Sequence, residues 1–128
     1  GPDPLRHLAR QGYEVRGSGQ AVLVDDPSAT PNLPRRHYLA LIHIVPLGHS
    51  GMYLNYAYRF SPEPPFAIIQ VSKVLPLLSA ITEHGKSFAF ASGLVVHNRT
   101  VAITYGAGDR DARAFVLTMD RLDEMFAC

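Results

Sequence analysis

The residues best suited to chemistry lie around one short turn near the C-terminal end of the sequence. Tyr105 ends an apolar run, and Asp109 follows it after the turn residues 106–108. A tyrosine ring can be buried while its hydroxyl stays available to a ligand. The carboxylate of Asp109 has two uses: it can cap the turn by accepting hydrogen bonds from backbone N–H groups, or it can accept hydrogen bonds from ligand hydroxyls. Both interpretations of Asp109 stay open.

Three further residues are candidates for binding. His43 lies in the apolar run 37–45, where a histidine either hydrogen-bonds within the core or contacts a ligand. Arg59, near the end of the next run, can bind a phosphate or a carboxylate through two parallel hydrogen bonds, or can be solvated. Arg16 is a cation at the start of a Gly-Ser-Gly loop. No residue of the sequence stands out as catalytic.

Several other kinds of chemistry lack their signatures. The histidines His37, His43 and His49 are spaced by six residues, which fits neither a helical i, i+4 pair nor a compact zinc pattern, so we expect no metal site. The sequence has no G-x-S-x-G elbow, no phosphate-binding P-loop and no dinucleotide fingerprint, so we expect no cofactor. The single cysteine, Cys128, has no partner for an internal disulfide.

Two motifs overlap at Asn98. The segment SGLVVHN at 92–98 looks like the terminal block of an intein, but Arg99 stands where that chemistry needs a Ser, Thr or Cys nucleophile, so we reject it. The triplet Asn98-Arg99-Thr100 also fits the N-glycosylation pattern in a turn that we expect to be exposed. The triplet matters only in a secreted protein.

The composition describes a folded domain without a nucleic-acid or membrane partner. Of 128 residues, 47% are hydrophobic and 18% are charged, so the chain can bury a core. Twelve Lys and Arg against eleven Asp and Glu give a net charge of +1, which argues against nucleic acid and anionic membranes. No run reaches the roughly 18 apolar residues of a membrane-spanning helix, and we find no signal-peptide pattern.

Strand patterns dominate the chain, because its apolar runs are short and bounded by Gly, Pro, Asn and Asp. The run 37–45 is apolar on both faces, as in a strand buried on both sides. We expect Asn98-Arg99 to form a tight turn and residues 120–126 to form a short closing helix. The expected strands are residues 21–24, 37–45, 52–60, 66–72, 88–91, 94–97, 100–105 and 112–118.

These strands predict an all-β fold of two four-stranded antiparallel β-propeller-type blades with a short C-terminal helix. The first blade takes residues 20–73, a connection takes 74–85, and the second blade with the closing helix takes 86–128. Residues 1–19 are expected to be irregular. Because a propeller ring needs about four or more blades, we expect the chain to be a fragment of a larger propeller.

Five segments carry a resemblance to a known family: RGSG at 16–19, YLALIH at 38–43, residues 53–60, FASGLV at 90–95 and TYGAGD at 104–109, followed by Ala112 and Leu122. In order and spacing they resemble the C-terminal two blades of the five-bladed propellers of the β-mannoside phosphorylases, glycoside hydrolase family 130. The chain looks closest to relatives of that fold found beside glycosyltransferase domains. The resemblance covers roughly residues 14–126.

The resemblance implies where a sugar binds. By position, His43 matches a histidine that helps to hold phosphate, while Tyr105 and Asp109 match residues near the sugar pocket, the aspartate contacting sugar hydroxyls. Arg59 and Arg16 are further candidates. Ile44 departs from the phosphorylases, which have glycine there. No segment matches the general-acid aspartate of the family, so the resemblance implies that this chain is catalytically incomplete alone.

Two functions of different classes follow. The chain is either the carbohydrate-active portion of a phosphorylase-like or glycosyltransferase-associated protein, with a glycan or small sugar as its partner, or a non-catalytic structural or protein-interaction module. Two isolated blades expose sheet edges and faces, which favours contact with the remaining blades of a longer chain or self-association. The compartment, cytoplasm or secretory lumen, stays open.

Overall fold

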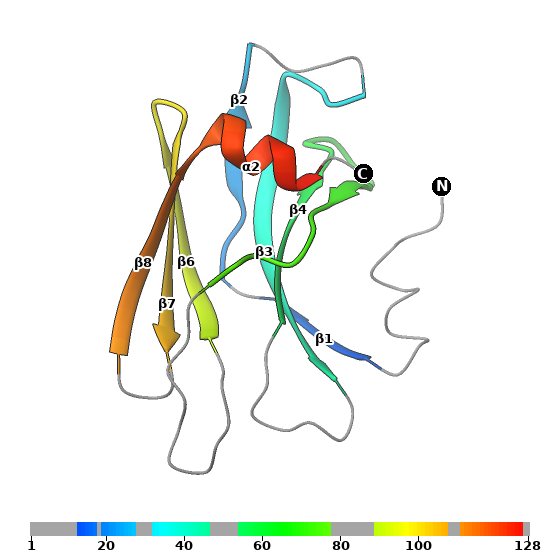
Figure 1. Ribbon diagram of the computed structural model, residues 1–128. Helices are drawn as coiled ribbons and strands as arrows, with labels where there is room; N and C mark the ends of the chain where they lie inside the picture. The colour runs from blue at the N-terminus through cyan, green and yellow to red at the C-terminus, as the bar shows by residue number, and fades with distance from the viewer. Residues whose placement is uncertain are drawn as a thin grey trace.

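The computed structural model of the chain describes residues 13–17, 19–27, 32–46, 54–77, 89–107 and 111–126. These residues form two antiparallel β-sheets, one of five strands and one of three, with one short helix (Figure 1). The prediction of a mostly β fold is confirmed. The described residues contain no closed ring of blades, and the propeller interpretation stays a prediction.

The five-stranded sheet is built around one long strand, β3 (Arg36–Pro46). One edge of β3 carries two short strands end to end, because β1 (Tyr13–Gly17) pairs with its C-terminal half and β2 (Val22–Asp25) with its N-terminal half. The other edge pairs with β4 (Leu54–Phe60), which pairs in turn with β5 (Ile68–Val71). Strands β2 to β5 thus follow one another as the expected meander.

Strand β1 corrects the expectation that residues 1–19 are irregular. Its five residues are too few for a clear periodic signal. Its partner is the C-terminal half of β3, from Ile42 to Pro46, which lies well further along the chain. The pairing that makes this segment a strand is therefore a long-range one, which no local pattern reveals.

Both faces of β3 are buried, as its unbroken apolar run predicts. Leu39 and Leu41 point into the core shared with the other sheet, and Ile42 and Ile44 point to the opposite side. All four side chains are at most 2% exposed. The interpretation of this run as a strand buried on both sides is confirmed for residues 39–44, while Tyr38 is half-buried.

Side chains of β4 alternate between two faces as expected. The face that carries the polar and small side chains is the buried one. Asn55, Ala57 and Arg59 are at most 3% exposed, whereas the aromatic side chains between them are half-buried. The buried face meets the second sheet and the helix, where Asn55 and Arg59 find hydrogen-bond partners. Polar residues are tolerated in this core because they hydrogen-bond across it.

The second sheet consists of β6 (Ala89–His97), β7 (Thr100–Ala107) and β8 (Asp111–Thr118). The turn Asn98-Arg99 joins β6 to β7 as predicted, and both residues have positive φ (47° and 62°), as a two-residue hairpin between twisted strands requires. The two strands expected at 88–91 and 94–97 are one strand with a bulge between Ala91 and Gly93. Among the described residues, this sheet therefore has three strands where four were expected.

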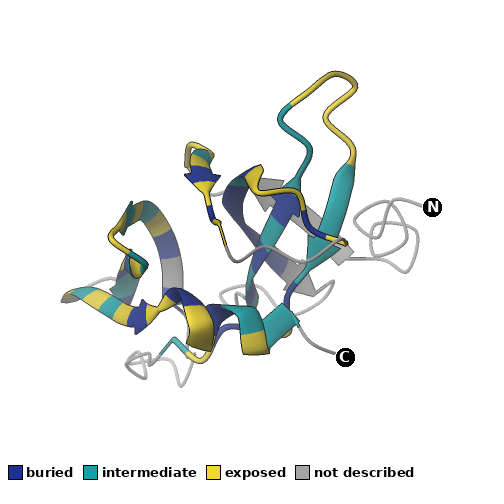
Figure 2. Cartoon of the chain, turned by 90° about the horizontal axis from the view of Figure 1, so that it is seen from above, coloured by how far each residue is buried: buried dark blue, intermediate teal, exposed yellow. Residues whose placement is uncertain are grey.

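The two sheets face each other around one hydrophobic core (Figure 2). Helix α2 (Met119–Phe126) follows β8 and crosses one end of this core, where Met119 and Leu122 are buried (Figure 1). We call this the helix end. At the opposite end, the loop end, β3 and β7 finish and β4, β6 and β8 begin. The expected closing helix, 120–126, agrees with α2 to within one residue.

Candidate functional site

Residues from three strands meet in one row at the loop end of the five-stranded sheet. Arg16 of β1 pairs in register with His43 of β3, and His43 pairs in register with Asn55 of β4. Two of the five candidate binding residues, Arg16 and His43, are thus backbone neighbours although they are far apart in the sequence. Asn55, which no sequence pattern singled out, completes the row.

Asn55 joins the two sheets at this end. Its Nδ2 donates a hydrogen bond to the carbonyl oxygen of Ala89 at 2.7 Å, and its Oδ1 accepts one from the backbone N–H of Ala91 at 3.3 Å. Both partners lie at the start of β6. A buried side-chain amide that both donates and accepts is a specific connection, because its geometry fixes how β4 and β6 lie against each other.

Tyr105 reaches the same end from the second sheet. It pairs in register with Ala91, the residue whose N–H binds Asn55. Its side chain is 5% exposed and belongs to the shared core, and His43 is 2% exposed. Both rings are therefore buried at the loop end. A ligand could reach the Tyr105 hydroxyl or the His43 ring nitrogens only at the bottom of a site.

Asp109 lies outside the described residues. Strand β7 ends at Ala107 and β8 begins at Asp111, both at the loop end, so the chain between them starts and finishes there. The four candidates Arg16, His43, Tyr105 and Asp109 thus belong to strands or connections of one end of the molecule.

Arg59 is placed at the other end. Its side chain is 3% exposed, and its Nη2 forms an ion pair with Asp123 of α2. Its Nη1 donates to Oε1 of Gln70 at 3.1 Å, and its guanidinium lies 4.0 Å from the ring centroid of Phe126. The sequence left Arg59 either solvated or ligand-binding, whereas the structure shows a cation that fastens α2 to β4 and β5.

A second arginine fastens the helix from the hairpin side. Arg99 donates from Nη1 to Asp26 and from Nη2 to Asp120, both at 2.6 Å, and Met119 N–H donates to its carbonyl oxygen at 2.8 Å. Asp26 is 4% exposed, and a buried carboxylate is destabilising unless a positive charge such as Arg99 compensates it. Arg99 therefore joins the end of β2, the β6–β7 turn and the start of α2, a role that its position inside a sequon-like triplet does not reveal.

His37 lies buried near these ion pairs. Its side chain is 1% exposed, and Nδ1 lies 2.9 Å from the carbonyl oxygen of Pro34, so this nitrogen carries the proton in the neutral ring. Burial lowers the pKa of His37, and the positive charge of Arg59 acts in the same direction. The Pro34 carbonyl, Asp26 and Asp123 act against that shift. The helix end therefore holds a buried histidine whose pKa is lowered, so that its neutral form is favoured.

The described residues hold no group of three or more His, Cys, Asp or Glu side chains arranged to bind a metal ion. Among the same residues, no helix is long and apolar enough to cross a membrane.

No family model, curated protein or solved structure matches the chain. The placement of its own residues is therefore the ground for proposing a function.

Proposed function

We propose that this chain is the carbohydrate-binding portion of a larger glycan-processing protein, and that its two sheets are neighbouring blades of a β-propeller. The observation that carries the proposal is a placement at the loop end: Arg16 and His43 are in register on neighbouring strands, and Tyr105 is in register with Ala91, whose N–H binds Asn55. These residues come from separate segments that resemble the mannoside phosphorylase family. Asp109 lies in the sequence between the end of β7 and the start of β8, which are both at this end.

The proposed site binds a sugar without transforming it. Tyr105 and His43 form its buried floor, and the carboxylate of Asp109 accepts hydrogen bonds from sugar hydroxyls. The two sheets hold this floor in place through Asn55, whose hydrogen bonds to Ala89 and Ala91 restrain its side chain. Catalysis then belongs to other parts of the larger protein, because no residue of this chain matches the acid of the family.

The test is a titration of the chain with methyl α- and β-mannosides and with other methyl glycosides, followed by amide chemical shifts. Proposed binding at Asp109 gives saturable shifts that Asp109→Asn abolishes. Asp111→Asn removes the same charge two residues away and serves as the matched control. Equal affinities for the two variants, or no saturable shifts in the folded wild-type chain, would refute the proposal.

A second candidate function, a protein-interaction module, has one observation in its favour. The outer face of the three-stranded sheet exposes Val95 (59%) and Val116 (61%), which lie in register on either side of Ala102. The rows on either side of these valines also contain no Lys, Arg, Asp or Glu. One row consists of His97, Thr100 and Thr118, and the other of Gly93, Thr104 and Ala114. Exposed apolar side chains that lie together on a surface can mark an interaction site, and this pair of valines has no charged residue in the adjoining rows.

Sedimentation velocity distinguishes this second function. If the face is an association surface for copies of the chain, the wild type shows a concentration-dependent larger species that Val116→Lys removes. Val74→Lys is the matched control, because it places the same charge at another exposed valine, which follows β5 of the other sheet. This control should leave association unchanged. A monomer at all concentrations would speak against self-association through this face.

A further inference from the structure

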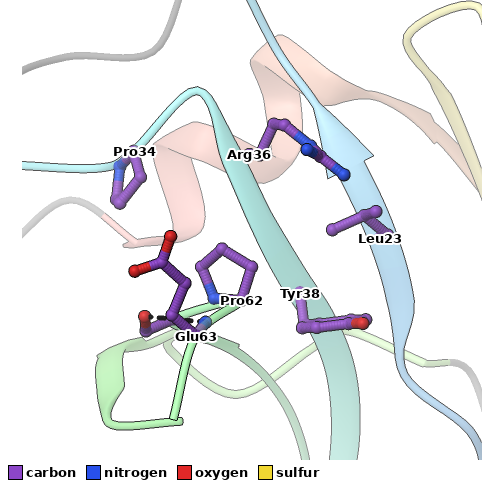
Figure 3. A pocket seen from close by; sticks show the side chains of 7 residues that line it. Leu23, Pro34, Arg36, Tyr38, Pro62 and Glu63 are labelled. Carbon is purple, nitrogen blue, oxygen red and sulfur yellow. Dashed lines mark hydrogen bonds between the residues drawn. The ribbon is translucent and has the colours of Figure 1, made fainter.

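A cavity lies on the opposite side of the five-stranded sheet from the core (Figure 3). Its volume is about 440 Å³, within the range of small-molecule sites. It is lined by residues of β2, of the start of β3 and of the segment that follows β4. Its described lining includes none of His43, Arg59 and Tyr105.

The apolar part of the cavity contains one aromatic ring, Tyr38, which is supported from outside the lining by a stack of two further rings. The ring of Tyr38 stacks on that of Phe60, with centroids 5.0 Å apart and planes 19° apart, and Phe60 stacks on Tyr58 at 5.8 Å. Leu23 and Pro62 lie beside Tyr38 in the lining. Stacking holds the Tyr38 ring in one orientation before a ligand arrives, which lowers the entropic cost of binding.

The polar part consists of two opposite charges that do not pair. Figure 3 shows Arg36 and Glu63 on different sides of the cavity, and within the described part of the chain neither side chain forms a hydrogen bond or an ion pair. The neighbouring Arg35, in contrast, donates from Nε to Asp25 at 2.6 Å. The backbone around Glu63 is fixed, because its N–H donates to Ser61 Oγ and its carbonyl oxygen accepts from Phe66 N–H.

We propose that this cavity is an accessory site for a neutral saccharide of one or two rings. A sugar ring has an apolar face of C–H groups, which can lie on Tyr38, and hydroxyls, which both donate and accept hydrogen bonds. Those hydroxyls match Glu63, which only accepts, and Arg36, which only donates. A net anion meets repulsion from Glu63 and a net cation from Arg36, so the charges favour a neutral ligand.

This site is separate from the loop end. Tyr38 and His43 point to opposite faces of β3 and lie five residues apart, about 16 Å along the strand. The accessory site therefore stands on its own geometry and does not depend on binding at Asp109. A protein with both sites would hold one glycan at two places or two glycans at once.

The experiment uses methyl β-glucoside, methyl α-mannoside, cellobiose and mannobiose as probes, with amide shifts read at Leu23, Tyr38, Ser61 and Glu63. We expect at least one probe to give saturable shifts at these residues. Arg36→Gln and Glu63→Gln should each weaken that binding about five- to tenfold, since each removes one charge-assisted hydrogen bond. Both side chains are exposed and unpaired among the described residues, so these variants should fold as the wild type does.

Arg35→Gln is the matched control, because it removes a cation one residue away that is committed to Asp25 and does not line the cavity. It should leave the affinity unchanged. The zwitterion proline tests the alternative that the two charges recognise opposite charges on a ligand. Binding of proline without any saccharide, equal affinity in all three variants, or no shifts in this region would overturn the proposal. Shifts confined to residues around Tyr105 would support the loop-end site and overturn this one.

Discussion

Arg59 of β4 and Asp123 of α2 form an ion pair that closes the helix end of the sandwich, although 64 residues separate them in the chain. The guanidinium is nearly inaccessible, while the side chain of Asp123 is 40% exposed. The cation also contacts Gln70 and the ring of Phe126, so three elements meet at one side chain. The attachment of α2 therefore depends on a charge that the strand buries.

We predict that Asp123→Ala lowers the free energy of unfolding by about 2 kcal/mol, because it leaves a buried cation without its counter-charge. Since Asp123 is partly exposed, this loss is smaller than that for a fully buried ion pair. Replacing both partners, Arg59→Met with Asp123→Leu, should cost less than Asp123→Ala alone, since no charge is then buried. Urea unfolding measures both. A double variant less stable than the single one would contradict this account of the helix end.

Asn55 should be as important at the loop end. Asn55→Leu leaves the carbonyl of Ala89 and the N–H of Ala91 buried without this partner, and we expect a loss of about 2–4 kcal/mol. Hydrogen exchange at Ala91 should accelerate more than at Ile103, in the middle of the neighbouring strand. Gln20→Ala removes an exposed amide instead and should change stability by less than about 0.5 kcal/mol. An Asn55→Leu chain as stable as the Gln20 control would show that the amide does not join the sheets.

Gly93, at the bulge in β6, lies close to the side chain of Thr104 on β7. A Cβ there would overlap Oγ1 of Thr104 on the neighbouring strand, closer than two such atoms can approach. We therefore expect Gly93→Ala to destabilise the chain by about 1–3 kcal/mol. Thr104→Ala removes the clashing oxygen, and the next atom, the Thr104 Cβ, lies at 3.7 Å, an ordinary contact. In thermal unfolding, the double variant should recover most of the stability that Gly93→Ala loses. If the stability changes of the two single variants simply add in the double variant, the strain lies elsewhere.

Stability should depend on pH through His37. Burial lowers its pKa below the value of about 6.5 that it has in the unfolded chain, so in the window between the two values the unfolded chain binds more protons. The stability that neutral, buried His37 contributes to the folded chain is fully present above about pH 6.5. It is lost as the pH falls through the lowered pKa. Through this one group, the free energy of unfolding changes by at most about 1.4 kcal/mol per pH unit.

The variant His37→Gln, which keeps a donor for the Pro34 carbonyl, should show a smaller decrease in stability between about pH 7 and about pH 5 than the wild type. Gln20→Ala, at an exposed site without a titratable group, serves as the control and should leave that decrease unchanged. Urea unfolding at a series of pH values measures both. Equal pH dependence in His37→Gln and the wild type would show that His37 is not the group responsible.

Local patterns predicted most of the strands but not the contacts between the sheets. The apolar run of β3 and the alternation of β4 follow from side-chain period alone, and the helix α2 from its amphipathic face. The bulge at Gly93 looked like a break between strands, because Ser and Gly favour turns in isolated segments. Strand pairing overrides that preference when a partner such as β7 is present.

The candidate site was harder to predict for a physical reason. An arginine near the end of a strand is usually solvated, and only the arrival of α2, 64 residues later, makes Arg59 a buried anchor. Asn55 has no distinguishing neighbours in the sequence, since its partners lie 34 and 36 residues away. Long-range hydrogen bonds of this kind leave no periodic trace, so the residue types can be read from the sequence while their roles cannot.

The most direct test of the central proposal is to map where a bound sugar perturbs the chain. Amide shifts are recorded for the wild type and Asp109→Asn during titration with methyl β-mannoside. The proposal predicts saturable shifts from Tyr105 to Ala107 and around His43 and Ala91 in the wild type, and their loss in the variant. Absence of shifts at the loop end, or shifts there that persist in Asp109→Asn, would contradict a sugar site at this end of the molecule.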